Sequence, residues 1–185
     1  MRILLDEKEL NAGVERLASE IDQHYGKDRP LTVIAVMTGS LVLLSDLIRR
    51  LSMPQRVGVI QASSYRGGMK SGELTVDAKM LIDVKNRDVL LVDDIFDTGH
   101  TITRVMERLK ELGPKSVKSC VLLHKRERQE VDYTPDYAAF HIPNEFVVGY
   151  GLDYEDMYRN LPYLAVLEEL DLTKHKELVA KQADE

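Results

Sequence analysis

One stretch in the middle of the chain constrains the fold more than any other. Residues 89–92 are four apolar side chains, followed by two acids and a glycine-containing loop. A short apolar run bounded by charge is typical of a buried parallel strand. Apolar residues then recur at helical spacing, at Ile102, Val105, Met106, Leu109 and Leu112. The stretch therefore predicts a strand, a loop and a helix, which is the repeating unit of an α/β fold.

The loop of this unit has the composition of a phosphate-binding turn. The start of a helix carries unpaired backbone N–H groups and a partial positive charge, which attract anions. Gly99 allows close backbone approach, and Thr98 and Thr101 add hydroxyl donors. Asp93 and Asp94 suit a ligand that also carries hydroxyls or a divalent cation. The loop thus indicates a sugar phosphate with a metal ion, and a plain turn with a helix cap is the simpler alternative.

Size and charge narrow the class of protein. The 185 residues, 44% hydrophobic and 30% charged, suit one soluble domain. A net charge of −6 and a pI near 5.4 argue against nucleic-acid and membrane-surface partners, which need a basic face. No segment approaches the roughly 18 apolar residues of a membrane span, and the N-terminal apolar run is too short for a signal peptide. The only cysteine, Cys120, suits a buried thiol in a reducing compartment, so we expect a cytoplasmic protein.

Two further segments are expected near the first loop. Residues 31–37 form an apolar run, followed by a Thr-Gly-Ser loop and a helix over residues 41–51. Ligands of open α/β sheets bind beyond the carboxyl ends of strands, so this loop should face the same crevice, although Ser40 as a simple helix cap is an alternative. The glycine- and serine-rich residues 63–74 are either a floppy hairpin connection or a mobile lid that excludes water.

The remaining elements are less distinctive. Asp6 and Glu9 have the spacing of a capping box, at the start of an amphipathic helix that ends near Gly26. Strands are expected over residues 57–62, 74–80 and 117–123, and short strands around 137–140, 146–148 and 163–166. The charged tail, about residues 168–185, is expected to be a partly frayed helix.

Residues 89–101 carry a resemblance to a known family. Four apolar residues, two acids, two apolar residues and Asp-Thr-Gly-x-Thr resemble the phosphoribosyl pyrophosphate motif of type I phosphoribosyltransferases. Residues 122–126, Phe146 to Tyr154 and Arg159 resemble the 6-oxopurine pocket of the hypoxanthine-guanine branch. The resemblance implies a single domain over residues 1–185 with a central, mostly parallel sheet flanked by helices. It also implies a small hood of short strands, a mobile lid loop, Mg²⁺ as cofactor and a homodimer or homotetramer.

The resemblance also implies roles for the residues of the central motif. Asp97 would be the catalytic base, and Asp93 and Asp94 would hold the ribose hydroxyls. The 5′-phosphate would bind the loop made of Thr98, Gly99, His100 and Thr101. Asp93 departs from the family's more common glutamate, which shortens the side chain by one methylene.

Other segments receive roles in the same way. Lys125 would donate to the purine O6, Phe146 would stack on the base, and the carbonyls of Val147 and Asp153 would accept from a guanine amino group. Arg159 would contact pyrophosphate together with the loop of Thr38 and Gly39. Asp153 would help to hold magnesium, with Asp93 and Asp94 acting through water or the ribose.

Two features of these segments are specific to the family or to this chain. A cis peptide is expected at Met37–Thr38, where Thr38 replaces the lysine or arginine often seen. Ser64 and Tyr65 match the pair found in the family's lid.

The implied reaction transfers the 5-phosphoribosyl group of phosphoribosyl pyrophosphate to N9 of hypoxanthine or guanine, as in purine salvage. The products would be inosine or guanosine monophosphate and pyrophosphate. One alternative is the same fold acting on xanthine or uracil. Another is a nucleotide-sensing regulator without catalysis, which would have no chemical need for Asp97.

Overall fold

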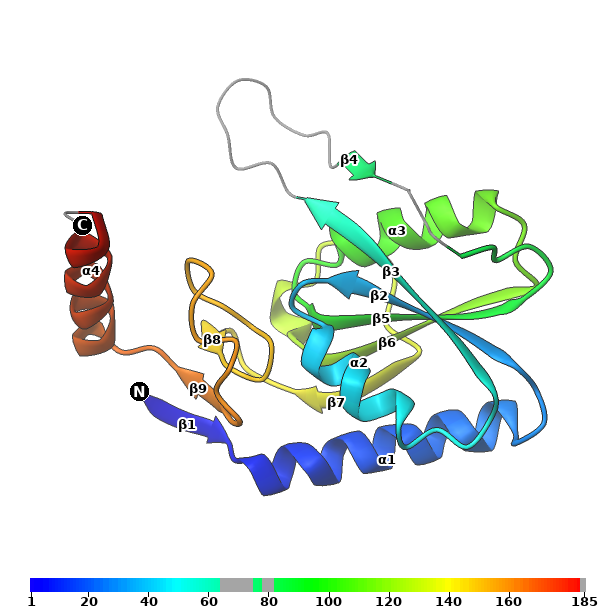
Figure 1. Cartoon of the computed structure of the whole chain (residues 1–185), viewed down its shortest axis with the longest axis horizontal. Coiled ribbons are helices and arrows are strands. Elements are labelled where there is room, and N and C mark those ends of the chain that lie inside the picture. The colour runs from blue at the N-terminus through cyan, green and yellow to red at the C-terminus, as the bar shows by residue number, and fades with distance from the viewer. Residues whose placement is uncertain (64–74, 78–81, 184–185) are drawn as a thin grey trace.

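The computed structural model describes residues 1–63, 75–77 and 82–183 (Figure 1). The predicted lid residues Ser64 and Tyr65 lie outside these ranges. In chain order, the elements are β1 (Arg2–Leu5), α1 (Glu7–Tyr25), β2 (Leu31–Met37), α2 (Leu41–Ile48), β3 (Gln55–Ser63), β4 (Thr75–Asp77), β5 (Asp88–Phe96), α3 (His100–Glu111), β6 (Ser116–His124), the 3₁₀ turn η1 (Arg126–Arg128), β7 (Tyr137–His141), β8 (Val147–Val148), β9 (Leu164–Val166) and α4 (Glu169–Ala183).

The main sheet has the order β4-β3-β2-β5-β6-β7. The strands from β3 to β7 in that order are parallel, and the short β4 pairs antiparallel with β3. The predicted, mostly parallel sheet flanked by helices is therefore confirmed. Because β2 and β5 are neighbours in register, with Ala35 opposite Val92, the loops that follow them emerge side by side.

Helices cover the two faces of this sheet in separate hydrophobic clusters. Alternate residues of a strand point to opposite faces, so Val33 and Ala35 pack with α1 and α2, whereas Ile34 and Val36 pack with α3. In Figure 1, α1 lies below the strands and α3 above them. A sheet covered on both faces explains why β2 and β5 are continuous apolar runs.

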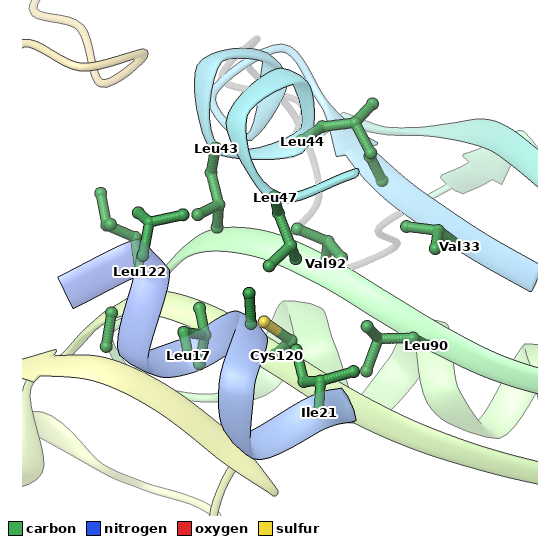
Figure 2. Close-up of a cluster of buried hydrophobic side chains, with 14 of the residues drawn as sticks. Leu17, Ile21, Val33, Leu43, Leu44, Leu47, Leu90, Val92, Cys120 and Leu122 are labelled. Atoms are coloured by element: carbon green, nitrogen blue, oxygen red, sulfur yellow. The ribbon is translucent and has the colours of Figure 1, made fainter. Parts of the chain in front are cut away.

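Cys120 lies inside the cluster formed with α1 and α2. Figure 2 shows its sulfur among Leu17 and Ile21 of α1, Leu47 of α2 and neighbouring strand residues. The residue is 0% exposed, and burial raises the pKa of its thiol. This thiol is the buried core residue that the sequence predicts.

The caps predicted at the N-termini of α1 and α2 differ in whether the structure contains them. At α1 the capping box is confirmed, because Asp6 accepts from the Glu9 N–H and the Glu9 side chain accepts from the Asp6 N–H, each at 2.8 Å. At α2 the simple cap is wrong, because the Ser40 hydroxyl donates to the Val36 carbonyl at 2.5 Å and makes no cap hydrogen bond.

A second, antiparallel sheet with the order β1-β9-β8 forms the predicted hood of short strands. It lies to the left of the main sheet in Figure 1, with α4 beyond it. The sequence analysis missed β1, because a four-residue strand has too little periodicity to identify. Among the helices that the structure describes, none is long and apolar enough to cross a bilayer.

Candidate active site

The loop between β5 and α3 has the geometry of an anion-binding turn. Gly99 has a φ of +92°, and α3 begins immediately after it at His100. A Cβ atom at Gly99 would lie 2.6 Å from the Phe96 ring and 2.3 Å from Val131, so both backbone conformation and packing require glycine. The N–H groups of the first turn of α3 have no acceptor within the helix and point toward the loop.

This loop forms one wall of a cavity of about 380 Å³. The opposite wall is the loop after β2, which contains the predicted cis peptide at Met37–Thr38. The predicted residues that line this cavity are Thr38, Gly39, Asp93, Asp94, Asp97, Thr98, Gly99, Thr101, Asp153 and Arg159. Residues from three separate chain segments, which follow β2, β5 and β8, therefore meet at the carboxyl edge of the sheet.

Two glycines allow these segments to touch. A Cβ atom at Gly39 would lie 1.7 Å from Oδ2 of Asp94, and one at Gly151 would lie 2.2 Å from the Gly39 carbonyl oxygen. Gly151 also has a φ of +101°, which favours glycine. The loop after β2 is therefore held between the carboxylate of Asp94 and the segment that follows β8.

The carboxylates of Asp93 and Asp94 lie at the floor of this cavity. Burial and the neighbouring charge of Asp94 raise the pKa of Asp93 well above its ordinary value. Burial also raises the pKa of Asp94, against the opposing effect of its hydrogen bonds and of the Arg159 charge. The two adjacent carboxylates are therefore poorly solvated, which disfavours their charged forms.

Arg159 and Asp153 form the outer rim of the cavity. The Nη2 atom of Arg159 lies 2.9 Å from Oδ1 of Asp153, and its Nη1 donates to the Gly151 carbonyl at 2.9 Å. The guanidinium is therefore fixed from two sides. Within the described residues, no cluster of three His, Cys, Asp or Glu side chains forms a ready-made metal site.

A second cavity of about 410 Å³ adjoins the first. All four predicted base-contacting residues line it: Lys125, Phe146, Val147 and Asp153. The Lys125 side chain is only 7% exposed, whereas Phe146 is 55% exposed and leaves its ring open to a stacking partner. The two cavities share the side chains of Asp94, Ile95, Asp97 and Asp153 as a common wall.

Asp97 lies in this common wall beside two cations. Its Oδ1 atom is 3.0 Å from Nε of Arg128 and 4.0 Å from Nζ of Lys125, although neither contact is an aligned hydrogen bond. Burial lowers the pKa of Lys125, and the charge of Asp97 opposes that shift. The sequence analysis missed Arg128, which η1 places three residues after Lys125. In a 3₁₀ turn, side chains three residues apart lie on the same side, so this spacing could have indicated that Arg128 lies near Lys125.

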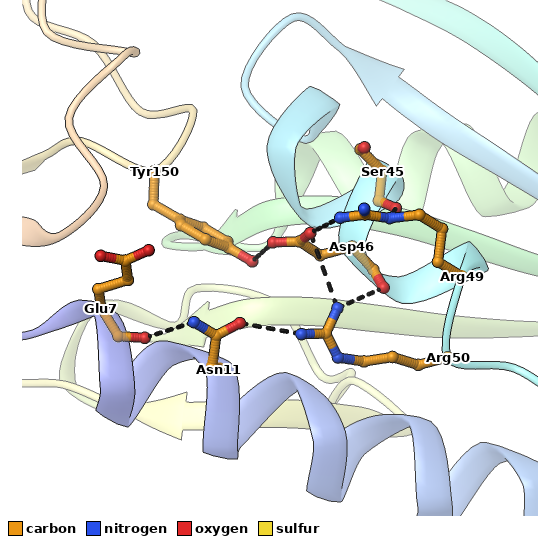
Figure 3. A network of polar contacts seen from close by, with 7 residues as sticks. All are labelled: Glu7, Asn11, Ser45, Asp46, Arg49, Arg50 and Tyr150. Carbon is orange, nitrogen blue, oxygen red and sulfur yellow. Dashed lines mark hydrogen bonds and ion pairs between the residues drawn. The ribbon is translucent and has the colours of Figure 1, made fainter.

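A polar network anchors the segment after β8 to the helices (Figure 3). The Tyr150 hydroxyl donates to Asp46 of α2 at 2.5 Å, and Asp46 also pairs with Arg49 and Arg50. Arg50 in turn donates to Asn11 of α1 at 2.9 Å. No sequence pattern indicates this network, because its members are separated by up to 143 positions, from Glu7 to Tyr150.

One predicted residue does not reach either cavity. His100 is exposed, and its Nε2 lies 2.8 Å from Oε2 of Glu130, away from the cavity linings. A side chain at the first position of α3 points out of the loop, so only its backbone N–H faces the ligand site. The predicted role of His100 uses only its backbone N–H, so the outward position of the side chain does not conflict with it.

Comparison with known proteins agrees with this geometry. The phosphoribosyl transferase domain family matches residues 2–155. The chain belongs to this family. A hypoxanthine-guanine phosphoribosyltransferase of Aquifex aeolicus is 38% identical over 170 residues, which cover 91% of this chain and 96% of the relative. One from Lactococcus lactis is 41% identical over 168 residues, covering 90% and 91%.

A solved structure supports the same relationship. The hypoxanthine-guanine phosphoribosyltransferase of Bacillus anthracis superposes with a TM-score of 0.85 at 36% identity, covering 91% of this chain and 99% of that one. The domain match ends at residue 155, so Arg159, β9 and α4 of this phosphoribosyltransferase lie outside it.

Proposed function

We propose that this phosphoribosyltransferase joins N9 of hypoxanthine or guanine to C1′ of phosphoribosyl pyrophosphate. The observation that carries the proposal is the wall shared by the two cavities. One cavity has an anion-binding loop and carboxylates for a sugar, and the other has a buried lysine and an open aromatic ring. A substrate in each cavity would bring the base and the ribose together at Asp97.

The first cavity would hold phosphoribosyl pyrophosphate. The backbone N–H groups of residues 98–101 and the hydroxyls of Thr98 and Thr101 would bind the 5′-phosphate. Asp93 and Asp94 would accept from the ribose hydroxyls. Arg159, with the main chain of Thr38 and Gly39, would bind the pyrophosphate oxygens. The substitution of Thr38 for a basic residue leaves that loop dependent on its backbone groups.

Mg²⁺ is the proposed cofactor of this cavity. Burial is the main cause of the raised pKa values of Asp93 and Asp94, so a cation beside them would favour their charged forms, and carboxylate oxygens are the ligands that Mg²⁺ prefers. Asp153, together with this pair, would hold the ion. When bound, it would neutralise charge on the departing pyrophosphate.

The second cavity would select the base. Lys125 would donate to O6, so adenine, whose 6-amino group is itself a donor, would be rejected. Phe146 would stack on the ring, and the carbonyls of Val147 and Asp153 would accept from the amino group of guanine. Hypoxanthine, guanine and xanthine share the O6 acceptor, so a contact with Lys125 alone would not distinguish them.

Asp97 would act as the base. The bond from C1′ to the pyrophosphate oxygen breaks, the N9 lone pair forms the new bond to C1′, and the proton on N7 passes to the Asp97 carboxylate. Pyrophosphate leaves with both electrons of the broken bond. Arg159 would stabilise the negative charge that develops on it.

Three broader features are part of the same proposal. The chain would function as one catalytic domain. The resemblance supports a homodimer or homotetramer, and the single buried thiol supports a reducing, cytoplasmic setting.

The test is product formation from phosphoribosyl pyrophosphate and Mg²⁺ with hypoxanthine, guanine, xanthine, adenine or uracil supplied separately. We expect turnover of hypoxanthine or guanine that depends on Mg²⁺. Asp97→Asn should lower kcat by roughly 10²- to 10⁴-fold, because the amide cannot accept the proton. Asp132→Asn, an exposed acid that lines neither proposed cavity, is the matched control. Binding of a nucleoside monophosphate without turnover of any base would favour the sensor instead.

A further inference from the structure

α4 places one buried side chain against the turn that carries Arg159. His175 is 1% exposed, although its helix neighbour Lys176 is exposed. Its Nε2 lies 2.8 Å from Oε2 of Glu155, and its Nδ1 lies 3.3 Å from the Tyr158 hydroxyl oxygen. A ring with its proton on Nε2 donates to Glu155 and accepts from Tyr158. His175 therefore bonds to two residues that lie between Asp153 and Arg159.

The backbone of this turn requires support. Glu155, Asp156 and Tyr158 have φ values of 50°, 62° and 74°, a region that residues with side chains rarely adopt. Within the turn, the backbone groups of Tyr154 and Met157 exchange two hydrogen bonds of 3.1 Å. Such a conformation persists when surrounding contacts impose it. The contacts of His175 come from outside the turn and hold two of its residues.

The turn determines where the Arg159 guanidinium lies. Arg159 stands one residue after Tyr158, and its backbone carbonyl accepts from the Gly151 N–H at 2.9 Å. Its side chain lines the first cavity and contacts Asp153 and Gly151. The proposed ion pair between Arg159 and the pyrophosphate oxygens depends on geometry. A small displacement of the turn would therefore weaken pyrophosphate binding.

Ring packing adds a second contact with the turn. The His175 and Tyr154 rings meet edge to face, with centroids 4.8 Å apart, and the Tyr154 ring meets Phe146 at 5.6 Å. A phenylalanine at position 175 would keep this aromatic packing and remove both hydrogen bonds. The packing and hydrogen-bonding contributions can therefore be separated by mutation.

We propose that His175 is a positioning residue that acts through Glu155 and Tyr158 to hold Arg159 for the pyrophosphate group of the substrate. The proposal rests on the proposed function, because it takes Arg159 as the pyrophosphate contact. It assigns α4, which lies outside the family match, a part in substrate binding.

The experiment measures the binding of inorganic pyrophosphate in the presence of Mg²⁺, both as product inhibition of the reaction and directly by calorimetry. His175→Phe should weaken pyrophosphate binding and raise KM for phosphoribosyl pyrophosphate by about five- to tenfold, the amount expected from one or two lost hydrogen bonds. KM for hypoxanthine should change less than about twofold, because the aromatic packing remains. Lys176→Ala, on the exposed side of α4, should match the wild type.

A second variant guards against misfolding of the first. Tyr158→Phe removes one of the two hydrogen bonds without adding volume, and it should give a smaller change in the same direction. Wild-type pyrophosphate affinity in both variants would overturn the role of His175 and leave the proposed function intact. A wild-type protein that neither binds pyrophosphate nor turns over hypoxanthine would overturn both.

Discussion

The Lys125 ammonium lies in a buried environment, where water solvates its charge poorly. Its side chain is almost fully buried, and its nearest anion, Asp97, lies 4.0 Å away. Burial therefore lowers the pKa of Lys125, and Asp97 offsets only part of the effect. The charged form is the stronger donor to a purine O6. With its proposed role as the donor to O6, Lys125 should make base selection sensitive to alkaline pH.

This sensitivity gives a prediction for the pH profile. As pH rises through the lowered pKa, Lys125 loses its proton, so kcat/KM for hypoxanthine should fall at a lower pH than an ordinary lysine would cause. Lys125→Arg keeps its charge at all these pH values, so its kcat/KM should decline at higher pH than that of the wild type. Ionisation of hypoxanthine is common to both enzymes and cancels in the comparison. Coincident profiles would show that Lys125 does not cause the decline.

At the scale of elements, the site depends on the close approach of loops that follow β2, β5 and β8. Gly39 and Gly151 lie at the two contacts, and neither contact leaves room for a Cβ atom. The Tyr150 network holds the third loop from the other side. The loops after β2 and β8 therefore meet through backbone at Gly151, and the loop after β2 meets β5 through the carboxylate of Asp94.

Gly151→Ala tests this packing. The new Cβ would displace the carbonyl of Gly39, so we expect kcat/KM for phosphoribosyl pyrophosphate to fall by roughly tenfold or more. Gly26→Ala is the matched control, because Gly26 also has a positive φ of +73° but has no atom near its Cβ position. Both variants should lose about 1–3 kcal/mol of stability from the backbone term, and only Gly151→Ala should lose activity. Denaturant unfolding and steady-state kinetics measure the two effects.

Elements with local signals were predicted from sequence, and elements without them were not. The strands β2 and β5, the capping box of α1 and the turn at Gly99 depend on residues within one short window. The strand β1, the Asp97 partner Arg128 and the Tyr150 network depend on partners elsewhere in the fold. The helix expected in the tail is present over Glu169–Ala183, but the sequence does not reveal that it buries His175. Its ordering depends on the turn after β8, which no local pattern reveals.

At the scale of the whole molecule, charge is distributed unevenly. The chain carries a net charge of −6, yet Lys125, Arg128 and Arg159 lie at the two adjoining cavities. These cations stand beside the acids Asp93, Asp94, Asp97 and Asp153, so a polyanionic substrate would meet a site of mixed charge. The expectation that nucleic acid is not a partner stays a prediction from the overall charge.

The position of Cys120 allows the opening of the main sheet to be measured by chemical labelling of its thiol. The thiol lies between the sheet and α1, so a reagent can reach it only when these layers separate. We expect the native protein to react with Ellman's reagent far more slowly than the denatured protein. Pyrophosphate with Mg²⁺ should slow the reaction further if it binds only the folded chain. Because there is no second cysteine, each labelled molecule records one opening of these layers, and at reagent concentrations where labelling is faster than reclosing the labelling rate equals the opening rate.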